Sequence, residues 1–535
     1  MPYRLGCPVT ALAIPALVRD SPLDLGSLRP RAASAYGSPM LPLRAETLAA
    51  CAERLPTPGY DRNRLSTGVV HFGVGGFHRA HQAMYHDRLM NQGHGPDWAI
   101  CGAGVMPADR RMKAVMDAQD GLYTLVAKQS DGTLEPRVIG AITDYVFALD
   151  DAEAVIERMA ADSTRIVSLT VTEGGYNLHP VTGDFDAHHP AVERDLEPGT
   201  TPRSTFGLVV EALRRRRERG LGPFTVMSMD NLEGNGSMAR RAFVAFARLR
   251  DDALGDWVDE HACFPNSMVD RITPQTTDAD RAELRERFGV DDRWPVVCEP
   301  YAQWVLEDAF CAGRPAYEHA GVQVVGDVRP YELMKLRLLN AGHQALCYFA
   351  YLAGYRLVHE AAQDPLFRRF LLAYMDNEGI PAVPPVPGID LDDYKHTLIE
   401  RFSNPEVRDT IARLCAQSSD RIPKWLLPVV RHQLATGGDV ERSAAVVASW
   451  ARYAEGVDEQ GRSIEVDDQL RERVMAAACR QRDDPVVFIA DREIFGDLVD
   501  DERFVAAYRA ALRSLHERGA RATLEWLAGA AQKSV

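Results

Sequence analysis

The chain has 535 residues, of which 46% are hydrophobic and 26% are charged, and its net charge is −15. That composition is ordinary for a globular protein, and the length leaves room for about two to four domains. An acidic chain repels phosphate backbones and anionic lipids, which excludes nucleic acid and membrane surfaces as natural partners.

Cysteine usage and hydropathy indicate the compartment. The nine cysteines never form a C-x-x-C pair, and their number is odd. This pattern argues against a disulfide framework or a cysteine zinc site and predicts a protein of the reducing cytoplasm. No window of about 18 uninterrupted apolar residues occurs, so the sequence predicts no transmembrane helix. We expect a monomer that acts on a small molecule.

Residues 1–40 differ from the rest of the chain. Prolines interrupt them at positions 2, 8, 15, 22, 30 and 39, and each removes a backbone donor and restricts its neighbour. The apolar residues follow no clear period, so we expect a disordered N-terminal extension. Met40 then opens the segment that leads into the first strong pattern.

Beyond the extension, the pattern changes once along the chain. Four short apolar runs separated by helical stretches predict a parallel sheet. These runs are residues 67–73, 98–102, 165–172 and 224–229. After about residue 330, strand-like runs are scarce and helical periods dominate. The expected helices are residues 331–357, 421–435, 442–455, 467–481 and 501–530.

A glycine-rich bend follows the first apolar run. Gly73, Gly75 and Gly76 would let the backbone approach a pyrophosphate, with the amides of the next helix pointing at its charge. The usual fingerprint is G-x-G-x-x-G, and His78 occupies its third glycine position. The loop alone therefore fits a nucleotide site and an ordinary turn equally. His78 and His81 lack an obvious third ligand, so we expect no metal.

The second apolar run leads into Asp109. An acid beyond the second strand of such folds accepts hydrogen bonds from the adenosine ribose and repels a 2′-phosphate. The alternative is an acidic residue that opens a helix, and Arg110 and Arg111 follow directly. Together the patterns predict an α/β protein. A Rossmann-type, dinucleotide-binding domain would span residues 41–328, and a mostly α-helical substrate and catalytic domain would span residues 329–535.

Four polar residues share one face of the first helix of the second domain. At about 100° per residue, Glu332, Lys335, Asn340 and His343 fall within an arc of roughly 140°. Such a set either meets solvent or lines a cleft.

Alcohol oxidation needs a base for the hydroxyl proton and donors for the developing alkoxide. A lysine can be that base if burial lowers its pKa toward neutrality, so Lys335 is a candidate. Asparagine amides are good neutral donors, and Asn340 lies on the same face. Asn231 is a second candidate donor, because it follows the fourth apolar run and ligands bind at the carboxyl ends of parallel strands.

Five motifs in a fixed order carry a family resemblance. They are Gly73-x-Gly75-Gly76-Phe77-His78-Arg79-Ala80-His81-Gln82, Thr172-Glu173-Gly174-Gly175-Tyr176, Asp230-Asn231-x-x-x-Asn235-Gly236, Val269-Asp270-Arg271-Ile272-Thr273-Pro274 and Lys335-x-x-x-x-Asn340-x-x-His343. From about residue 41 to the C-terminus, the chain resembles the polyol-specific long-chain dehydrogenases. Residues 295–300 and 386–390 are most similar to the branch that acts on mannitol.

The resemblance implies a metal-independent, NAD-dependent oxidation of D-mannitol to D-fructose, and the reverse reduction. D-arabinitol or fructuronate would be the alternative substrates. It further implies that Lys335 is the general base and that Asn231 and Asn340 form an oxyanion pocket. Glu173 and Glu332 would flank a water path for the released proton.

The resemblance also implies the binding residues. Substrate hydroxyls would contact Asp270, His343, Arg413 and Arg421. The cofactor would contact a larger set, formed by Gly73, Gly75, Gly76, Phe77, His78, Arg79 and Asp109.

The sequence departs from the family pattern at two positions. Arg421 stands where the family has lysine, and Ala108 stands where a second acid precedes Asp109. A hexuronate would require an extra cation, for which Arg421 is a candidate. A nucleotide-binding sensor without turnover is the alternative from a different class. The presence of Lys335 with both asparagines argues against it, because a sensor needs no base.

Overall fold

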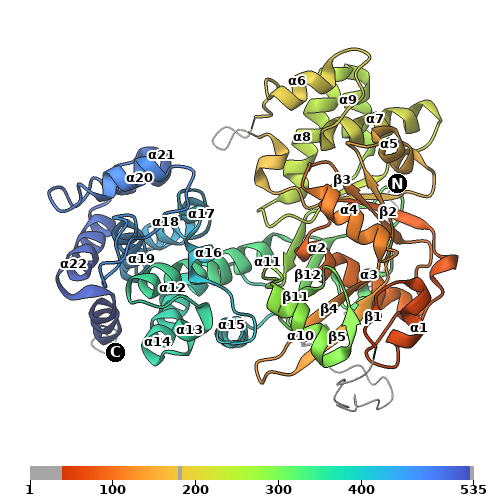
Figure 1. The fold of residues 1–535 in the computed structure, drawn as a ribbon. Coiled ribbons are helices and arrows are strands. Elements are labelled where there is room, and N and C mark those ends of the chain that lie inside the picture. Colours follow the sequence, from red (N-terminus) through yellow and green to blue (C-terminus); the bar gives the residue numbers. More distant parts are fainter. Residues whose placement is uncertain (1–38, 179–183, 531–535) are drawn as a thin grey trace, which may run out of the picture.

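The computed structural model describes residues 39–178 and 184–530. Of the predicted N-terminal extension, residues 1–38 lie outside this description. The described chain forms two halves that lie side by side (Figure 1), and α11 (Arg329–Met334) lies at their junction. Among the described residues, every helix is too short or too polar to cross a bilayer.

A five-stranded, entirely parallel sheet forms the centre of the N-terminal half. Its order is β6-β3-β2-β7-β8, and each neighbouring pair is parallel. The strands are β2 (Thr67–Phe72), β3 (Ala99–Gly104), β6 (Ile142–Phe147), β7 (Ile166–Leu169) and β8 (Thr225–Ser228). The four predicted runs are thus confirmed as strands of a parallel sheet, although the third ends at Leu169, three residues early.

The edge strand β6 was not predicted. Its sequence is ITDYVF, and only three of its six residues are buried. Because an edge strand of this kind is half exposed, Thr143 and Asp144 interrupt the apolar run that marks the buried strands.

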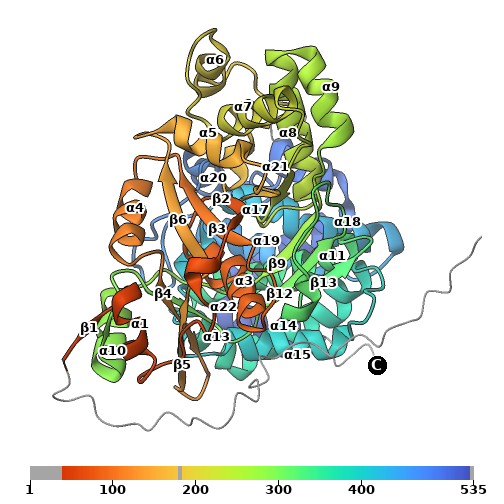
Figure 2. The ribbon, with the colours of Figure 1, turned by 90° about the vertical axis from the view of Figure 1, so that its right-hand side faces the viewer.

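Helices cover both faces of the parallel sheet. Apolar side chains of α5, α7, α8 and α9 form one core layer, and those of α3 and α4 form the other. The helices of this half are α1 (Leu48–Cys51), α2 (Gly76–Ala80), α3 (Gln82–Asn91), α4 (Asp109–Ala118), α5 (Ala152–Ala160), α6 (Pro190–Leu196), α7 (Thr205–Glu218), α8 (Asn235–Arg250), α9 (Asp252–His261) and α10 (Asp278–Phe288). Figure 2 shows α5 to α9 gathered at one end of this half.

Three smaller sheets extend this half and were also not predicted. Their orders are β1-β10, β11-β4-β5 and β13-β12-β9. Their strands are β1 (Leu41–Pro42), β4 (Tyr123–Lys128), β5 (Leu134–Ile139), β9 (Ser267–Asp270), β10 (Val290–Asp291), β11 (Val296–Cys298), β12 (Gln303–Glu307) and β13 (Gln323–Val325). The strand β9 carries Asp270 at its end, beside the junction between the halves.

The C-terminal half is helical, as predicted, around one large apolar core. After α11 come two π-turns and eleven α-helices. They are η5 (Lys335–Asn340), α12 (Ala341–Leu352), α13 (Val358–Gln363), α14 (Pro365–Tyr374), η6 (Met375–Gly379), α15 (Leu391–Phe402), α16 (Ile411–Cys415), α17 (Ser418–Trp425), α18 (Leu427–Thr436), α19 (Glu441–Tyr453), α20 (Arg471–Ala478), α21 (Arg492–Phe495) and α22 (Glu502–Ala530).

The boundaries of several predicted helices were wrong. The helix predicted to reach residue 357 ends at Leu352, because Gly354 adopts a positive φ of 101° that stops it. The predicted 421–435 helix is two helices, which meet at Leu426 just before Pro428. The last helix has a kink at Gly519, whose φ of 82° is not helical.

Candidate active site

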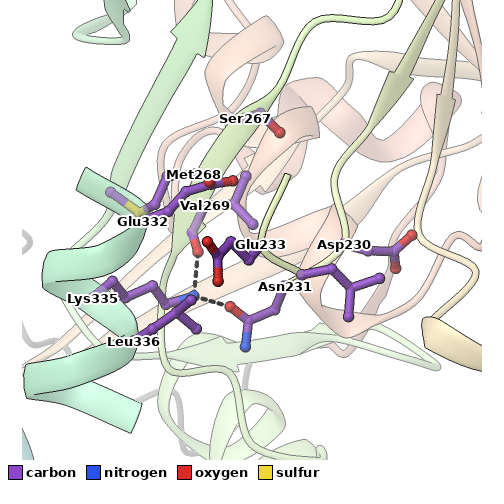
Figure 3. Close-up of a pocket in the computed structure, with 10 residues that line it drawn as sticks. Asp230, Asn231, Glu233, Ser267, Met268, Val269, Glu332, Lys335 and Leu336 are labelled. Atoms are coloured by element: carbon purple, nitrogen blue, oxygen red, sulfur yellow. Dashed lines mark hydrogen bonds between the residues drawn. The ribbon is translucent and has the colours of Figure 1, made fainter. Parts of the chain in front are cut away.

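Lys335 lies at the junction of the two halves. It belongs to the helical half, and its ammonium donates to two acceptors of the N-terminal half. The Nζ atom is 2.5 Å from Oδ1 of Asn231 and 2.7 Å from the carbonyl oxygen of Val269 (Figure 3). Only 6% of the residue is exposed, and burial lowers the pKa of Lys335 to about 8 against the attraction of Asp270. The amine therefore loses its proton far more easily near neutral pH than an exposed lysine does, as a base requires.

The loop after β8 holds Asn231 firmly. The carboxylate of Asp230 accepts from the amide of Thr172 at 2.9 Å and from the Tyr176 hydroxyl at 2.7 Å. Asn235 opens α8 and donates to the carbonyl oxygens of Asp230 at 2.9 Å and Ser267 at 2.8 Å. Because its Oδ1 accepts from Lys335, Asn231 is oriented with its amide N–H groups available to another acceptor.

A small cavity opens beside Lys335. Glu332 and Glu233 also line it, and Figure 3 shows both carboxylates on the same side of the lysine. Glu332 accepts from the amide of Gly234 at 3.2 Å, and burial raises the pKa of its carboxyl to about 8. Lys335 and Glu332 therefore both exchange protons near neutral pH and lie one helical turn apart.

The helix that carries the candidate set is not a uniform α-helix. In the π-turn η5 the amide of Ala341 donates to the carbonyl of Leu336, five residues back. On a uniform helix Lys335 and Asn340 would mark the two ends of the predicted 140° arc. A π-turn has more residues per turn, so residues five apart lie nearer to the same side than on an α-helix. The turn therefore brings Lys335 and Asn340 closer to one side.

Two members of the set retain free hydrogen-bonding capacity. Within the described residues, Oδ1 of buried Asn340 and Nε2 of buried His343 have no hydrogen-bond partner. Burial lowers the pKa of His343 to about 3, so the ring is neutral, and it packs on Phe402 at 4.3 Å between ring centres. His343 also lines a second small cavity together with Arg401 and Asp409.

Sequence reasoning did not identify Arg401, which is buried at the junction. From α15 it donates to both oxygens of Asp270 at 2.8 and 2.9 Å, and to both oxygens of Glu299 at 2.7 and 2.9 Å. Its guanidinium stacks 4.0 Å from the ring centre of Tyr301. Burial opposes the charge on Asp270, but Arg401 outweighs that cost and holds the pKa of Asp270 below its usual value.

The two predicted substrate arginines lie near one another. Arg413 is bound to Asp409, with Nε 2.6 Å from Oδ1, and Asp409 lines the second cavity. Arg421 donates to the carbonyl of Arg413 at 3.1 Å and lies 5.5 Å from the ring centre of Trp425. Arg413 therefore contacts a residue that lines the second cavity, and Arg421 lies one contact further away.

The glycine loop follows β2 directly. Gly73 has a φ of 89°, and a methyl group on it would lie 2.2 Å from the carbonyl oxygen of Thr170. A methyl group on Gly75 would meet only the Gly73 carbonyl, at 3.8 Å, within a radius of 4 Å. The loop thus packs tightly on one side and faces open space on the other, where α2 begins at Gly76. This geometry fits a bound pyrophosphate.

The polar side chains of the same motif point inward. His78 stacks on His71 at 3.5 Å between ring centres, and burial lowers its pKa well below the usual value. His81 is also buried and bonds to the carbonyl of Gln303 at 2.9 Å. Buried Arg79 donates to the carbonyls of Gly75 and Trp294. Only the backbone of His78 and Arg79 is therefore placed to contact a cofactor.

Asp109 opens α4, just beyond β3. One oxygen of its carboxylate accepts from the amides of Val105 and Met106, both at 2.9 Å. Asp109 therefore shapes the loop in which a ribose would lie, and its other oxygen makes no further bond in the described residues. The adjacent Arg110 is paired with Asp150 at 2.7 Å on the surface.

Glu173 begins a 3₁₀ turn after β7, but its side chain lies outside the described part of the structure. In that part, no three His, Cys, Asp or Glu side chains are grouped so that they could hold a metal ion.

Family models match both halves of the chain. The mannitol dehydrogenase Rossmann domain matches residues 67–319, and the mannitol dehydrogenase C-terminal domain matches residues 327–516. The mannitol 2-dehydrogenase of Phaeosphaeria nodorum is 46% identical over 476 residues, which cover 88% of this chain and 83% of that protein. The mannitol 2-dehydrogenase of Pyricularia oryzae is 45% identical over 474 residues, covering 87% and 94%.

Two solved structures share the fold. A Pseudomonas fluorescens mannitol 2-dehydrogenase in complex with NAD and D-mannitol has a TM-score of 0.84 and 46% identity, covering 91% of this chain and 99% of that one. A substrate-free D-sorbitol dehydrogenase has a TM-score of 0.82 and 37% identity, covering 90% and 100%. The resemblance seen in the sequence is thus confirmed, and the chain belongs to the mannitol dehydrogenase family.

Proposed function

We propose that this protein is an NAD-dependent polyol dehydrogenase that oxidises D-mannitol to D-fructose and catalyses the reverse reduction without a metal ion. The observation that carries the proposal is Lys335, buried beside Asn231 at the junction of the halves with a pKa of about 8. Family membership and the mannitol 2-dehydrogenase relatives support the choice of substrate and cofactor. In this proposal, residues 41–328 form the domain that binds NAD, and residues 329–535 form the substrate and catalytic domain.

NAD, when bound, supplies the acceptor for the hydride. The open side of the loop at Gly73, Gly75 and Gly76, with the Phe77, His78 and Arg79 backbone that follows, would hold its pyrophosphate. Asp109 would accept hydrogen bonds from the adenosine ribose through its unused oxygen.

Lys335 would take the proton from the substrate hydroxyl as the C–H bond of the carbon that bears this hydroxyl breaks. The amides of Asn231 and Asn340 would donate to the oxygen as it becomes an alkoxide and then a carbonyl. The proton would leave Lys335 along a water path, and Glu332 and Glu173 are the two acids that we assign to it. His343, Asp270, Arg413 and Arg421 would bind the remaining hydroxyls.

The pKa of Lys335 predicts opposite pH dependences for the two directions. Polyol oxidation needs the neutral amine, so kcat/KM should rise about tenfold per pH unit below pH 8 and level off above it. Ketose reduction needs the ammonium, so its kcat/KM should fall as pH rises past about 8. Initial rates in both directions test this, and profiles that stay flat from about pH 6 to 10 would contradict the assignment.

A substrate panel tests the function itself. NADH formation should be fastest with D-mannitol, compared with D-sorbitol and D-arabinitol, and NADH consumption should be faster with fructose than with fructuronate. The rates should be unchanged after prolonged chelator treatment. Preference for fructuronate would indicate that Arg421 binds the carboxylate of this substrate. If cofactor binds but no polyol or ketose turns over, the protein is a nucleotide-binding sensor.

Asp109→Ala should raise kcat/KM with NADP about tenfold, because removing a charge near the 2′-phosphate relieves roughly 1–2 kcal/mol of repulsion. The same carboxylate also holds the amides of Val105 and Met106. Asp109→Asn separates the two roles, since its amide oxygen still accepts from that loop. We expect Asp109→Asn to gain NADP activity with less loss of NAD activity. An unchanged NADP to NAD ratio in both variants would place discrimination elsewhere, for example at Arg110.

A further inference from the structure

We propose that Tyr374 is a positioning residue for the reaction, because its hydroxyl holds the π-turn that brings Lys335 and Asn340 to one side of their helix. This inference rests on the proposed function. Tyr374 is fully buried at the end of α14, and its hydroxyl donates to the carbonyl of Arg337 at 3.0 Å. Arg337 lies in the middle of η5, between the two candidate catalytic side chains.

The geometry of η5 needs such support. A π-turn accommodates one more residue than an α-turn, and its backbone bonds are less favourable than those of an α-helix, which explains why π-turns are rare. If the segment relaxed to an α-helix, Asn340 would lie about 140° around the helix from Lys335. The hydroxyl of Tyr374 binds a backbone oxygen within the turn and so favours the π conformation locally.

A second π-turn packs on the first. The segment η6 (Met375–Gly379) follows Tyr374 directly, and a methyl group on Gly379 would lie 2.8 Å from Cδ2 of Leu338 and 3.5 Å from the Arg337 carbonyl. Glycine at position 379 therefore allows η6 to lie directly against η5. Its φ of −71° suits any residue, so close packing and not backbone conformation requires the glycine here.

The second π-turn is itself anchored to the core. Glu378 is fully buried and accepts from the amides of Arg442 at 2.7 Å and Ser443 at 2.8 Å, at the start of α19. A continuous set of contacts thus runs from α19 through η6 and Tyr374 to the turn that holds the lysine and the asparagine. None of these supporting groups contacts the cavity beside Lys335.

The test compares two buried tyrosines that make the same kind of bond. Tyr331 lies on α11, and its hydroxyl donates at 2.8 Å to the carbonyl of Pro387, which is not part of η5. Tyr374→Phe should lower kcat for polyol oxidation by about tenfold to a hundredfold, because small displacements of catalytic groups have effects of that size. KM and NADH affinity should change less than about twofold, and the pH at half-maximal kcat/KM should shift.

Tyr331→Phe should lose a similar amount of thermal stability but keep its kcat and its pH profile. Gly379→Ala places a methyl group against Leu338 and the Arg337 carbonyl of η5, and it should reproduce the kcat loss of Tyr374→Phe. If Tyr374→Phe and Gly379→Ala both keep kcat within about twofold of that of Tyr331→Phe, with the same pH profile, the inference is wrong. Absence of polyol turnover in the unmodified protein would instead overturn the proposed function, so the two failures are distinguishable.

Discussion

Lys335→Ala is expected to lower kcat for polyol oxidation by about 10²- to 10⁴-fold, because the variant lacks the group that accepts the hydroxyl proton. Lys335 makes no contact with the glycine loop, so NADH affinity should stay near its normal value. Stopped-flow rates and NADH fluorescence titration measure the two quantities separately. The deleted side chain leaves space beside Asn231 and Val269, so small primary amines should restore part of the lost rate.

Lys128→Ala is a matched control for this substitution. Lys128 is also largely buried, but its ammonium is paired with Asp280 and Glu283, and it lines neither cavity. Its removal should leave kcat unchanged. If Lys335→Ala retains more than about a tenth of normal kcat at neutral pH, another group is the base.

Arg401→Met is expected to destabilise the protein by about 3–5 kcal/mol, because it leaves the buried carboxylates of Asp270 and Glu299 without their common partner. The free energy of unfolding of Arg401→Lys should lie between those of Arg401→Met and the unmodified protein, since one ammonium cannot replace four guanidinium hydrogen bonds. Urea unfolding followed by circular dichroism gives the free energies of unfolding.

Two further variants test the cause of that loss. Arg110→Met removes a similar pair on the surface, with Asp150, and should cost less than about 1 kcal/mol. The triple variant Asp270→Asn, Glu299→Gln, Arg401→Met removes all three charges and should recover most of the stability. If the triple variant is no more stable than Arg401→Met, packing and not charge explains the loss.

Sequence patterns predicted the features that depend on neighbouring residues. Buried strands such as β2 and β8 are continuous apolar runs, and they were found. The partnership of Lys335 with Asn231 followed from two local facts, a polar helix face and an asparagine at a strand end. The edge strand β6 was missed because Asp144 breaks its pattern, and edge strands need no continuous apolar run.

The remaining features depend on contacts between distant segments. Arg401 is 131 residues from Asp270 and 102 residues from Glu299. No local pattern therefore indicates this pairing, and the sequence of the Arg401 helix is that of an ordinary amphipathic helix. Only the docking of α15 against β9 turns this arginine into a buried cation. The π-turn was missed for another reason, since one extra residue in a turn changes the hydrophobic period too little to be detected over a single helix.

The hydrogen bonds of Lys335 cross from one half of the molecule to the other. The nitrogen belongs to the helical half, and its two acceptors follow β8 and end β9 in the N-terminal half. The amine loses both acceptors if the halves separate, so we expect a separately produced helical half to carry an ordinary, protonated lysine. In the proposed mechanism, proton acceptance is therefore a property of the docked pair, and a motion that opened the junction would also restore the ammonium.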